Sequence, residues 1–312
     1  MNDPAFSDLR IAIFGCGRMG KTRARCIEQL GGRIAFAYDV DPGAARTLGG
    51  GARVLDAPGD LDLDALDALF VCTPPGDRGT VELAALRHGH AVFVEKPLAV
   101  DLDAARPWVE AAAAGAGVTA VGYMNRYRSA VERALAVVRD EPPLLLCGVW
   151  ASGKYARDWW LDPARSGGPL NEQMSHLLDL LRALGGEIAT VAAAGPTSDP
   201  RTATDAAVAL TFAGDHAGTI AYSCRAETKG IGLRVVTPSR TVQLEGWDFR
   251  DAATPDDEDP FLAETAAFLA AAASKAAPHP RSEIADAART QAVADAVAEA
   301  LRSGRRVAPS TP

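Results

Sequence analysis

Short apolar runs alternate with helical segments through the first part of the chain. The strand-like runs RIAIF, RIAFAY, ALFVC, AVFVE and VTAV begin at positions 10, 33, 68, 91 and 118, and segments with helical spacing separate them. Continuous apolar runs are typical of strands that are buried on both faces of a parallel sheet. The alternation of strand and helix therefore predicts an α/β domain with a doubly wound parallel sheet over residues 1–121.

The pattern changes after Gly122. A helical segment at 129–139, the strand-like LLLCGVW and a helix at about 170–184 precede five strand-like runs that follow one another with only turn residues between them. Successive strands joined by turns favour antiparallel pairing. We therefore predict a second, α+β domain over residues 122–312, with a mostly antiparallel open sheet and two alanine-rich helices within 261–303.

Composition narrows the class of protein. The length of 312 residues fits two domains, and 40 acidic against 32 basic side chains give a formal charge of −8, which disfavours nucleic acid and anionic membranes as partners. No apolar stretch reaches the roughly 20 residues of a membrane helix, and the N-terminal residues show no signal-peptide pattern. Five scattered cysteines without a CxxC pair favour reduced thiols over disulfides or structural zinc. We expect a cytoplasmic protein without a metal, in which the acidic run at 251–260 is a solvated loop.

A glycine-rich motif, GCGRMG, follows the first strand-like run and opens a helix. This context favours a dinucleotide site because the first glycine permits a tight turn, the second admits a pyrophosphate and the third permits close packing of helix on strand. The start of the helix offers unpaired N–H groups to the phosphates. A plain glycine turn is the alternative. We expect the cofactor to contact Gly15, Gly17, Arg18, Met19 and Gly20.

Asp39 ends the second strand-like run. A carboxylate at this position would accept hydrogen bonds from the adenosine ribose hydroxyls and repel a 2′-phosphate, which favours NAD over NADP. The nearby cations Arg18 and Lys21 leave NADP open. A turn or capping role is the alternative for Asp39, but Asp41 fits that role better because it precedes Pro42.

The AVFVE run leads into Glu95-Lys96-Pro97 at the predicted carboxyl edge of the sheet, where open α/β folds bind ligands. Lys96 could orient a substrate hydroxyl, stabilise an alkoxide or join a proton relay. The alternative is a surface ion pair with Glu95. Thr73 and Pro74 end the preceding strand-like run, and they either flank the nicotinamide ribose or form a simple turn.

The helix predicted at 170–184 carries Glu172, His176 and Asp179 at spacings of four and three residues, which places them on one helical face. Imidazole titrates near neutrality, so His176 could take a hydroxyl proton and return it. The alternative is a core histidine, with both carboxylates facing water. Just upstream, Trp159 and Trp160 could bind a polyhydroxylated ligand, although tryptophans in a small domain more often serve packing.

Together these motifs resemble the glucose-fructose oxidoreductase, inositol dehydrogenase and rhizopine-catabolism (Gfo/Idh/MocA) family. GCGRMG, Asp39, TPP, HAVFVEKP, GYMNRY and GGPLNEQMSHLLD occur in the family's order. The resemblance implies an N-terminal Rossmann domain, a C-terminal α/β domain whose open sheet often forms dimer or tetramer contacts, and an active site between the two. We therefore expect a homodimer or homotetramer.

The resemblance also implies roles for single residues. Lys96 matches the family lysine that contacts substrate and nicotinamide, His176 matches the acid/base histidine, and Glu172 stands where the family usually has aspartate. Arg78 departs from the pattern, because many relatives have histidine near this position. We expect three catalytic residues, Lys96, His176 and Glu172; four further cofactor contacts, Thr73, Pro74, Glu95 and Lys96; and six substrate contacts, Tyr123, Asn125, Arg126, Trp159, Trp160 and Asp179.

The activity that these residues imply is NAD(P)-dependent hydride transfer at a carbinol or carbonyl carbon of a sugar, cyclitol or related polyol. Two alternatives remain open. One is an epimerase, eliminase or glycosidase that uses NAD transiently and recycles it in place. The other is a dinucleotide-binding sensor without redox activity, and the presence of both Lys96 and His176 argues against it.

Overall fold

The computed structural model describes residues 4–48, 51–197, 199–251, 259–274 and 277–312. The chain forms two compact units: unit 1 comprises Met1–Leu98, Asp103–Gly122 and Asp259–Asp286, and unit 2 comprises Ala99–Leu102, Tyr123–Glu258 and Ala287–Pro312. The acidic run at 251–260 lies largely outside the described residues. None of the helices in the described part of the chain is long and apolar enough to cross a membrane.

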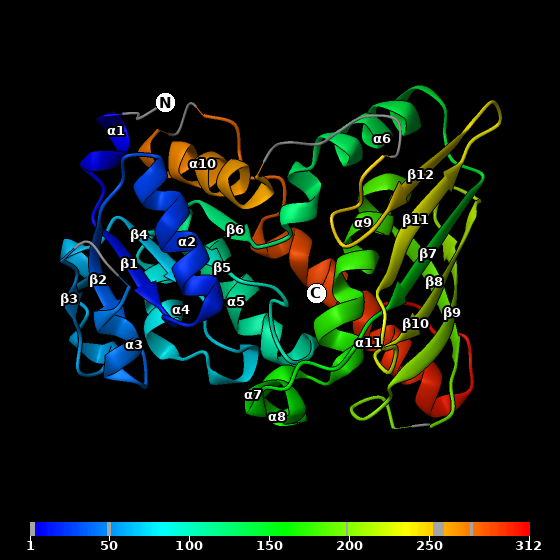
Figure 1. Ribbon diagram of the computed structural model, residues 1–312, viewed down its shortest axis with the longest axis horizontal. Coiled ribbons are helices and arrows are strands. Elements are labelled where there is room, and N and C mark those ends of the chain that lie inside the picture. Colours follow the sequence, from blue (N-terminus) through cyan, green and yellow to red (C-terminus); the bar gives the residue numbers. More distant parts are fainter. Residues whose placement is uncertain (1–3, 49–50, 198, 252–258, 275–276) are drawn as a thin grey trace. The chain divides into compact units, whose positions relative to one another are not determined.

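The sheet of unit 1 has six parallel strands in the order β3-β2-β1-β4-β5-β6 (Figure 1). Its direction of winding reverses between β1 and β4, which is where doubly wound sheets bind their ligands. The predicted parallel α/β sheet is therefore confirmed. The strands are β1 Ile11–Phe14, β2 Ile34–Tyr38, β3 Arg53–Val54, β4 Ala68–Val71, β5 Ala91–Val94 and β6 Thr119–Val121.

Five of the helices of unit 1 connect or cover these strands. They are α2 Arg18–Gln29, α3 Pro42–Arg46, α4 Thr80–Arg87, α5 Leu102–Gly115 and α10 Pro260–Ala273, and the short α1 Pro4–Ser7 precedes β1. The sequence pattern assigned α10 to the second domain, whereas the structure groups it with unit 1. The reason is packing, because α10 lies beside α2 (Figure 1) and its buried Phe268 makes edge contacts with Phe70 and Phe93 of the sheet at 5.1 and 5.5 Å.

Unit 2 contains a second six-stranded sheet in the order β12-β11-β7-β10-β9-β8 (Figure 1). Only the β7–β10 pair is parallel, so the predicted, mostly antiparallel sheet is confirmed. Burial alternates along the strands, which gives the sheet one face packed in the core and one open face. The strands are β7 Leu145–Ala151, β8 Ile188–Ala194, β9 Asp205–Phe212, β10 Ala217–Ser223, β11 Gly230–Val236 and β12 Thr241–Glu245.

The helices of unit 2 cover the buried face of this sheet. Leucines of α9 and apolar residues of α11 share one hydrophobic core with the strands. The helix predicted at 170–184 begins with a π-helical turn, Leu170–Met174, and continues as α9, Ser175–Gly185. Such turns occur often at functional sites. The other helices are α6 Ser129–Asp140, α7 Asp158–Leu161, α8 Pro163–Ser166 and α11 Ile284–Ser303.

Candidate active site

The glycine loop between β1 and α2 has the geometry of a phosphate cradle. Gly15 has a φ of +88°, and a Cβ there would lie 2.7 Å from the main-chain nitrogen of Thr73, so only glycine fits. A Cβ at Gly20 would lie 2.1 Å from the Gly15 oxygen, whereas a Cβ at Gly17 would meet nothing within 4 Å. Gly17 is the N-cap of α2 and provides no side-chain hydrogen bond to the helix. The first N–H groups of α2 therefore suit a diphosphate.

Asp39 lies directly beside this loop, one residue past the end of β2. Its Oδ2 accepts a hydrogen bond from the Cys16 N–H at 2.6 Å, and its Oδ1 accepts one from the Asp41 N–H at 2.9 Å. Each carboxylate oxygen retains a second lone pair, which could accept a ribose hydroxyl. Asp41 takes the capping role predicted for it, because its Oδ1 accepts from the Gly43 N–H at the start of α3.

Thr73 follows β4 at the same carboxyl edge of the sheet. Its hydroxyl oxygen is buried and has no hydrogen-bond partner among the described residues. Buried hydroxyls are ordinarily hydrogen-bonded, so this one fits a polar group of a ligand. Pro74 comes next and begins the turn that leads to Pro75–Asp77. The orphaned hydroxyl, the open side of Gly17 and the free lone pairs of Asp39 all fit a dinucleotide.

Glu95, the residue before Lys96, is directed into unit 1. Its Oε1 accepts from Nε of Arg23 at 2.7 Å, and Nη2 of the same arginine donates to Oε2 of Glu264 at 2.6 Å. The three side chains are almost fully buried. The guanidinium carbon also lies 4.2 Å from the centre of the Phe93 ring. The side chain of Glu95 is therefore a tether between β5, α2 and α10.

Lys96 follows β5 on irregular backbone and is half-buried. The peptide bond between Lys96 and Pro97 is cis. Arg78, in the segment before α4, donates hydrogen bonds to the main-chain oxygens of Glu95, Pro97 and Leu98. The segment that carries Lys96 is thus held in two ways. Arg23 binds the side chain of Glu95, and Arg78 binds the main-chain carbonyl groups on either side of Lys96.

In unit 2, His176 lies in the first turn of α9 and is buried. Its ring is parallel to that of Trp150 at 5.5 Å between centroids and makes edge contacts with Trp247 at 5.8 Å and Tyr123 at 6.5 Å. Three aromatic rings therefore limit how the imidazole can turn. The ammonium nitrogen of Lys229 lies over the Trp247 ring, 5.2 Å from its centre, so this cluster also includes a cation–π contact.

Glu172 lies in the π-helical turn, and it is 5% exposed. Its Oε2 accepts a hydrogen bond from the indole N–H of Trp160 at 2.9 Å. Trp160 is itself 1% exposed, and Trp159 is partly buried against the core of unit 2. The two tryptophans that could bind a polyhydroxylated ligand thus both have contacts within the protein. The hydrogen bond from Trp160 fixes the carboxylate of Glu172.

Asp179 and Arg126 bind each other. Nε and Nη2 of Arg126 donate to the two carboxylate oxygens of Asp179 at 2.9 and 2.6 Å, and both residues are buried. Asn125 is also buried, and its Oδ1 accepts from Nε of Arg128 at 2.7 Å. Glu172, His176 and Asp179 are all buried, so neither carboxylate faces water as the alternative interpretation of this helix required.

The structure therefore brings the expected residues together in two groups. Within unit 1, the glycine loop, Asp39, Thr73, Glu95 and Lys96 lie along the carboxyl ends of β1, β2, β4 and β5. Within unit 2, Tyr123, Glu172, His176 and their partners surround the start of α9. The contacts of Arg23 and Trp247 have no local sequence signal, because both side chains contact residues that are distant in the chain.

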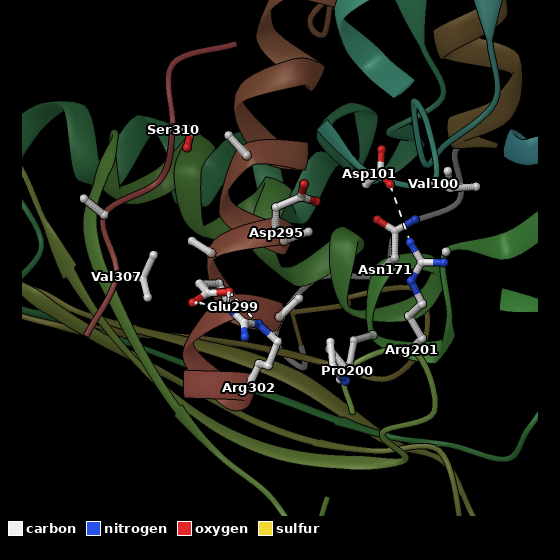
Figure 2. A pocket seen from close by; sticks show the side chains of 17 residues that line it. Val100, Asp101, Asn171, Pro200, Arg201, Asp295, Glu299, Arg302, Val307 and Ser310 are labelled. Carbon is white, nitrogen blue, oxygen red and sulfur yellow. Dashed lines mark hydrogen bonds and ion pairs between the residues drawn. The ribbon is translucent and has the colours of Figure 1, made fainter. Parts of the chain in front are cut away.

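A cavity of about 360 Å³ lies elsewhere in unit 2, between α11, the loop near Asp101 and the C-terminal segment (Figure 2). Four of its charged side chains form two ion pairs. Arg201 lies 3.8 Å from Asp101, and Arg302 lies 2.7 Å from Glu299. None of the expected catalytic residues lines it.

Comparison with known proteins identifies the family. A family model described as "Oxidoreductase family, NAD-binding Rossmann fold" matches residues 9–123, and the model of the GFO/IDH/MocA C-terminal domain matches residues 145–242. The chain belongs to the Gfo/Idh/MocA family. Its unit 1 is an NAD-binding Rossmann domain of this family.

Among individual members, the chain is 33% identical over 185 residues to the inositol 2-dehydrogenase of Paracoccus denitrificans, covering 56% of this chain and 53% of that protein. It is 31% identical over 187 residues to that of Cereibacter sphaeroides, with the same coverage. The chain thus matches about half the length of these curated relatives.

Solved structures share the whole fold. The WlbA dehydrogenase from Bordetella pertussis, in complex with NADH and UDP-GlcNAcA, is 21% identical with a TM-score of 0.85, covering 97% of this chain and 99% of that one. A levoglucosan dehydrogenase in complex with NADH is 17% identical with a TM-score of 0.86, covering 97% and 100%. At these identities the likeness shows the fold alone.

Proposed function

We propose that this protein is an NAD-dependent dehydrogenase or reductase that acts on a CH–OH or carbonyl carbon of a sugar, cyclitol or related polyol. The observation that carries the proposal is the carboxyl edge of the unit 1 sheet. There the glycine loop, the carboxylate of Asp39 and the orphaned hydroxyl of Thr73 form a dinucleotide cradle, and Lys96 leaves the same edge. The inositol 2-dehydrogenase relatives support the choice of a polyol substrate.

A bound NAD, held by the glycine loop, Asp39 and Thr73, would supply the hydride chemistry, and the protein supplies position and charge. Lys96 donates a hydrogen bond to the reacting oxygen and stabilises negative charge on it. His176 takes the hydroxyl proton during oxidation and returns it during reduction. Glu172, fixed by the indole of Trp160, holds the substrate or the imidazole in place. Tyr123, Asn125, Arg126 and Asp179 shape the substrate site, with Arg126 and Asp179 acting as a pair.

Asp39 sets the preference for NAD. A 2′-phosphate at this position would meet a carboxylate that two main-chain N–H groups already hold in place. Arg18 and Lys21 are exposed on α2 and leave some use of NADP open.

We also propose that the protein is a homo-oligomer that pairs through the open face of the unit 2 sheet. Val149 and Leu145 of β7 are 46% and 37% exposed on that face. Exposed apolar residues on a sheet face suit burial against a second copy. A cytoplasmic location is part of the proposal, and the free state of all five cysteines supports it.

The experiment is a screen of cyclitols and sugars with NAD, in which NADH formation is followed at 340 nm. Lys96→Ala and His176→Ala should each lower kcat by about 10²–10⁴ while NADH affinity stays nearly unchanged, since proton transfer and charge stabilisation have contributions of this size. His88→Ala, at an exposed histidine of unit 1, is the matched control and should keep full turnover.

Each outcome decides between the candidate functions. Net accumulation of NADH supports a dehydrogenase. Product formed without net change in NADH supports transient use of the cofactor. NADH binding without any turnover supports a sensor. Near-wild-type turnover in both Lys96→Ala and His176→Ala overturns the roles proposed for these residues.

A further inference from the structure

Arg78 makes an unusual set of contacts for a half-buried arginine. Its Nη1 donates to the main-chain oxygens of Pro97 at 2.6 Å and Leu98 at 2.5 Å. Its Nη2 donates to the main-chain oxygens of Glu95 at 2.6 Å and Thr73 at 3.3 Å. One guanidinium therefore binds main-chain carbonyls of the segments that follow both β4 and β5.

Three of these carbonyls surround Lys96 in the chain, because they belong to the residue before it and to the two residues after it. The regular strand ends at Val94, so the position of Lys96 depends on contacts made by the irregular segment itself. Hydrogen bonds from a charged donor are shorter and stronger than neutral ones. A planar guanidinium, with its donors in a fixed fork, defines the relative positions of the groups it binds.

We propose that Arg78 is a positioning residue that sets the location of the Lys96 ammonium by clamping the main chain on both sides of it. This inference rests on the catalytic role proposed for Lys96. Through the Thr73 carbonyl the same clamp joins the Lys96 segment to the loop whose orphaned hydroxyl fits the cofactor. Arg78 thereby fixes the position of Lys96 relative to the loop that fits the cofactor.

Lysine cannot replace this group. The three donors of a lysine ammonium share one nitrogen at the end of a flexible chain, whereas four carbonyls in two segments need donors spread over a plane. Arg78→Lys would retain the positive charge and lose the clamp. Comparison of Arg78→Lys with Arg78→Ala therefore separates the effect of the clamp's geometry from the effect of its charge.

The test compares Arg78→Ala and Arg78→Lys with wild type in steady-state turnover, with NADH affinity measured by fluorescence titration. We expect kcat to fall about 10²-fold in Arg78→Ala, because a displacement of about 1 Å at a reacting group has effects of this size. NADH affinity should stay within about threefold, since the contacts of the glycine loop and Asp39 are untouched. Arg78→Lys should recover little of the loss. Added ethylguanidinium should restore turnover of Arg78→Ala and leave Arg87→Ala, an exposed control on α4, unaffected.

A double variant separates positioning of Lys96 from general loss of structure. If Arg78 acts through Lys96, Arg78→Ala should have almost no further effect on the residual turnover of Lys96→Ala. A purely structural role predicts additive losses and equal failure to bind NADH, and that result overturns the inference. So does turnover of Arg78→Ala within twofold of wild type. Should Arg78→Ala fail to fold, Arg78→Lys with the same double variant carries the test.

Failure of the inference and failure of the proposed function give different results. Wild-type turnover in Lys96→Ala means that the proposed function is wrong, whatever Arg78 does. Loss of turnover in Lys96→Ala with full turnover in Arg78→Ala leaves the proposed function standing and refutes only the positioning role.

Discussion

Replacing Arg23 with methionine tests how the Lys96 segment is anchored in unit 1. Burial alone would lower the pKa of Arg23, but the carboxylates of Glu95 and Glu264 outweigh it and raise that pKa, so the guanidinium is charged at any working pH. It pairs with these two carboxylates at 2.7 and 2.6 Å, and none of the three side chains is more than 7% exposed. Methionine keeps an unbranched apolar stem in place of the arginine's and removes the guanidinium with its charge.

The expected loss of stability follows from the two carboxylates that Arg23→Met leaves without a cation. Removing one partner of a buried ion pair costs about 3–5 kcal/mol, because the other charge is left unpaired. Here two carboxylates lose the same cation, so the loss in Arg23→Met should reach at least this range at pH 7.5. Arg10→Met is the matched control: Arg10 pairs with Asp67 at 2.9 Å, but the two side chains are 49% and 32% exposed. An exposed pair contributes much less than a buried one, because solvent screens its charges.

The assay is urea unfolding of wild type and both variants at pH 7.5 and pH 5.0. An unpaired buried carboxylate can avoid its desolvation cost by taking up a proton, and lower pH favours this. The folded state of Arg23→Met should then bind more protons than the unfolded state, so its deficit relative to wild type should shrink as the pH falls. Adding Glu95→Gln and Glu264→Gln to Arg23→Met should recover most of the stability at pH 7.5, because no buried charge is left.

Two results would refute this reasoning. One is a loss in Arg23→Met that is no larger than that in Arg10→Met. The other is a deficit that grows toward acid pH, which would mean that the two carboxylates do not depend on Arg23 for their charge.

Three further predictions concern other parts of the chain. Asp39→Asn should raise the ratio of kcat/KM with NADP to that with NAD by about tenfold or more, since charge repulsion is lost; an unchanged ratio would contradict the role of Asp39. Burial, reinforced by Asp39, raises the pKa of Cys16 to about 12, so iodoacetamide at pH 8 should leave Cys16 unmodified in the native protein and modify it after unfolding, as read by peptide mass spectrometry. Val149→Glu should lower the oligomeric state measured by light scattering, and a mass equal to that of wild type would show that this face is not the interface.

The elements of both sheets could be predicted from the sequence because their signals are local. Each strand of unit 1 between β1 and β5, apart from the two-residue β3, is a short apolar run, and β1, β4 and β5 are buried along their whole length. The glycine loop can be predicted as well, because a local sequence motif encodes it: Gly15 has a positive φ, and Gly20 packs closely on Gly15. The place of Asp41 before Pro42 likewise predicts the cap that it forms.

The partners of the site residues could not be predicted in the same way. The sequence predicts that Glu95 contacts the cofactor or forms a surface pair, yet its carboxylate is bound by Arg23. The same arginine binds Glu264, which lies 241 residues after Arg23 in the chain. The spacing of Glu172 and His176 predicted a regular helix, whereas a π-helical turn holds Glu172 where the indole of Trp160 can reach it. Such contacts depend on tertiary packing, and hydrophobic periodicity carries no information about them.

Two arginines hold the short motif Glu95-Lys96-Pro97 in place. Arg23 holds the side chain of Glu95 from within unit 1, and Arg78 holds the carbonyl groups on both sides of Lys96. The side chain of Glu95 thereby anchors the segment that carries Lys96. If both anchors are required, loss of Arg23 should lower stability more than turnover per folded molecule, because the main-chain clamp persists. Loss of Arg78 should do the reverse, since the buried ion pairs of Glu95 persist and only the lysine moves.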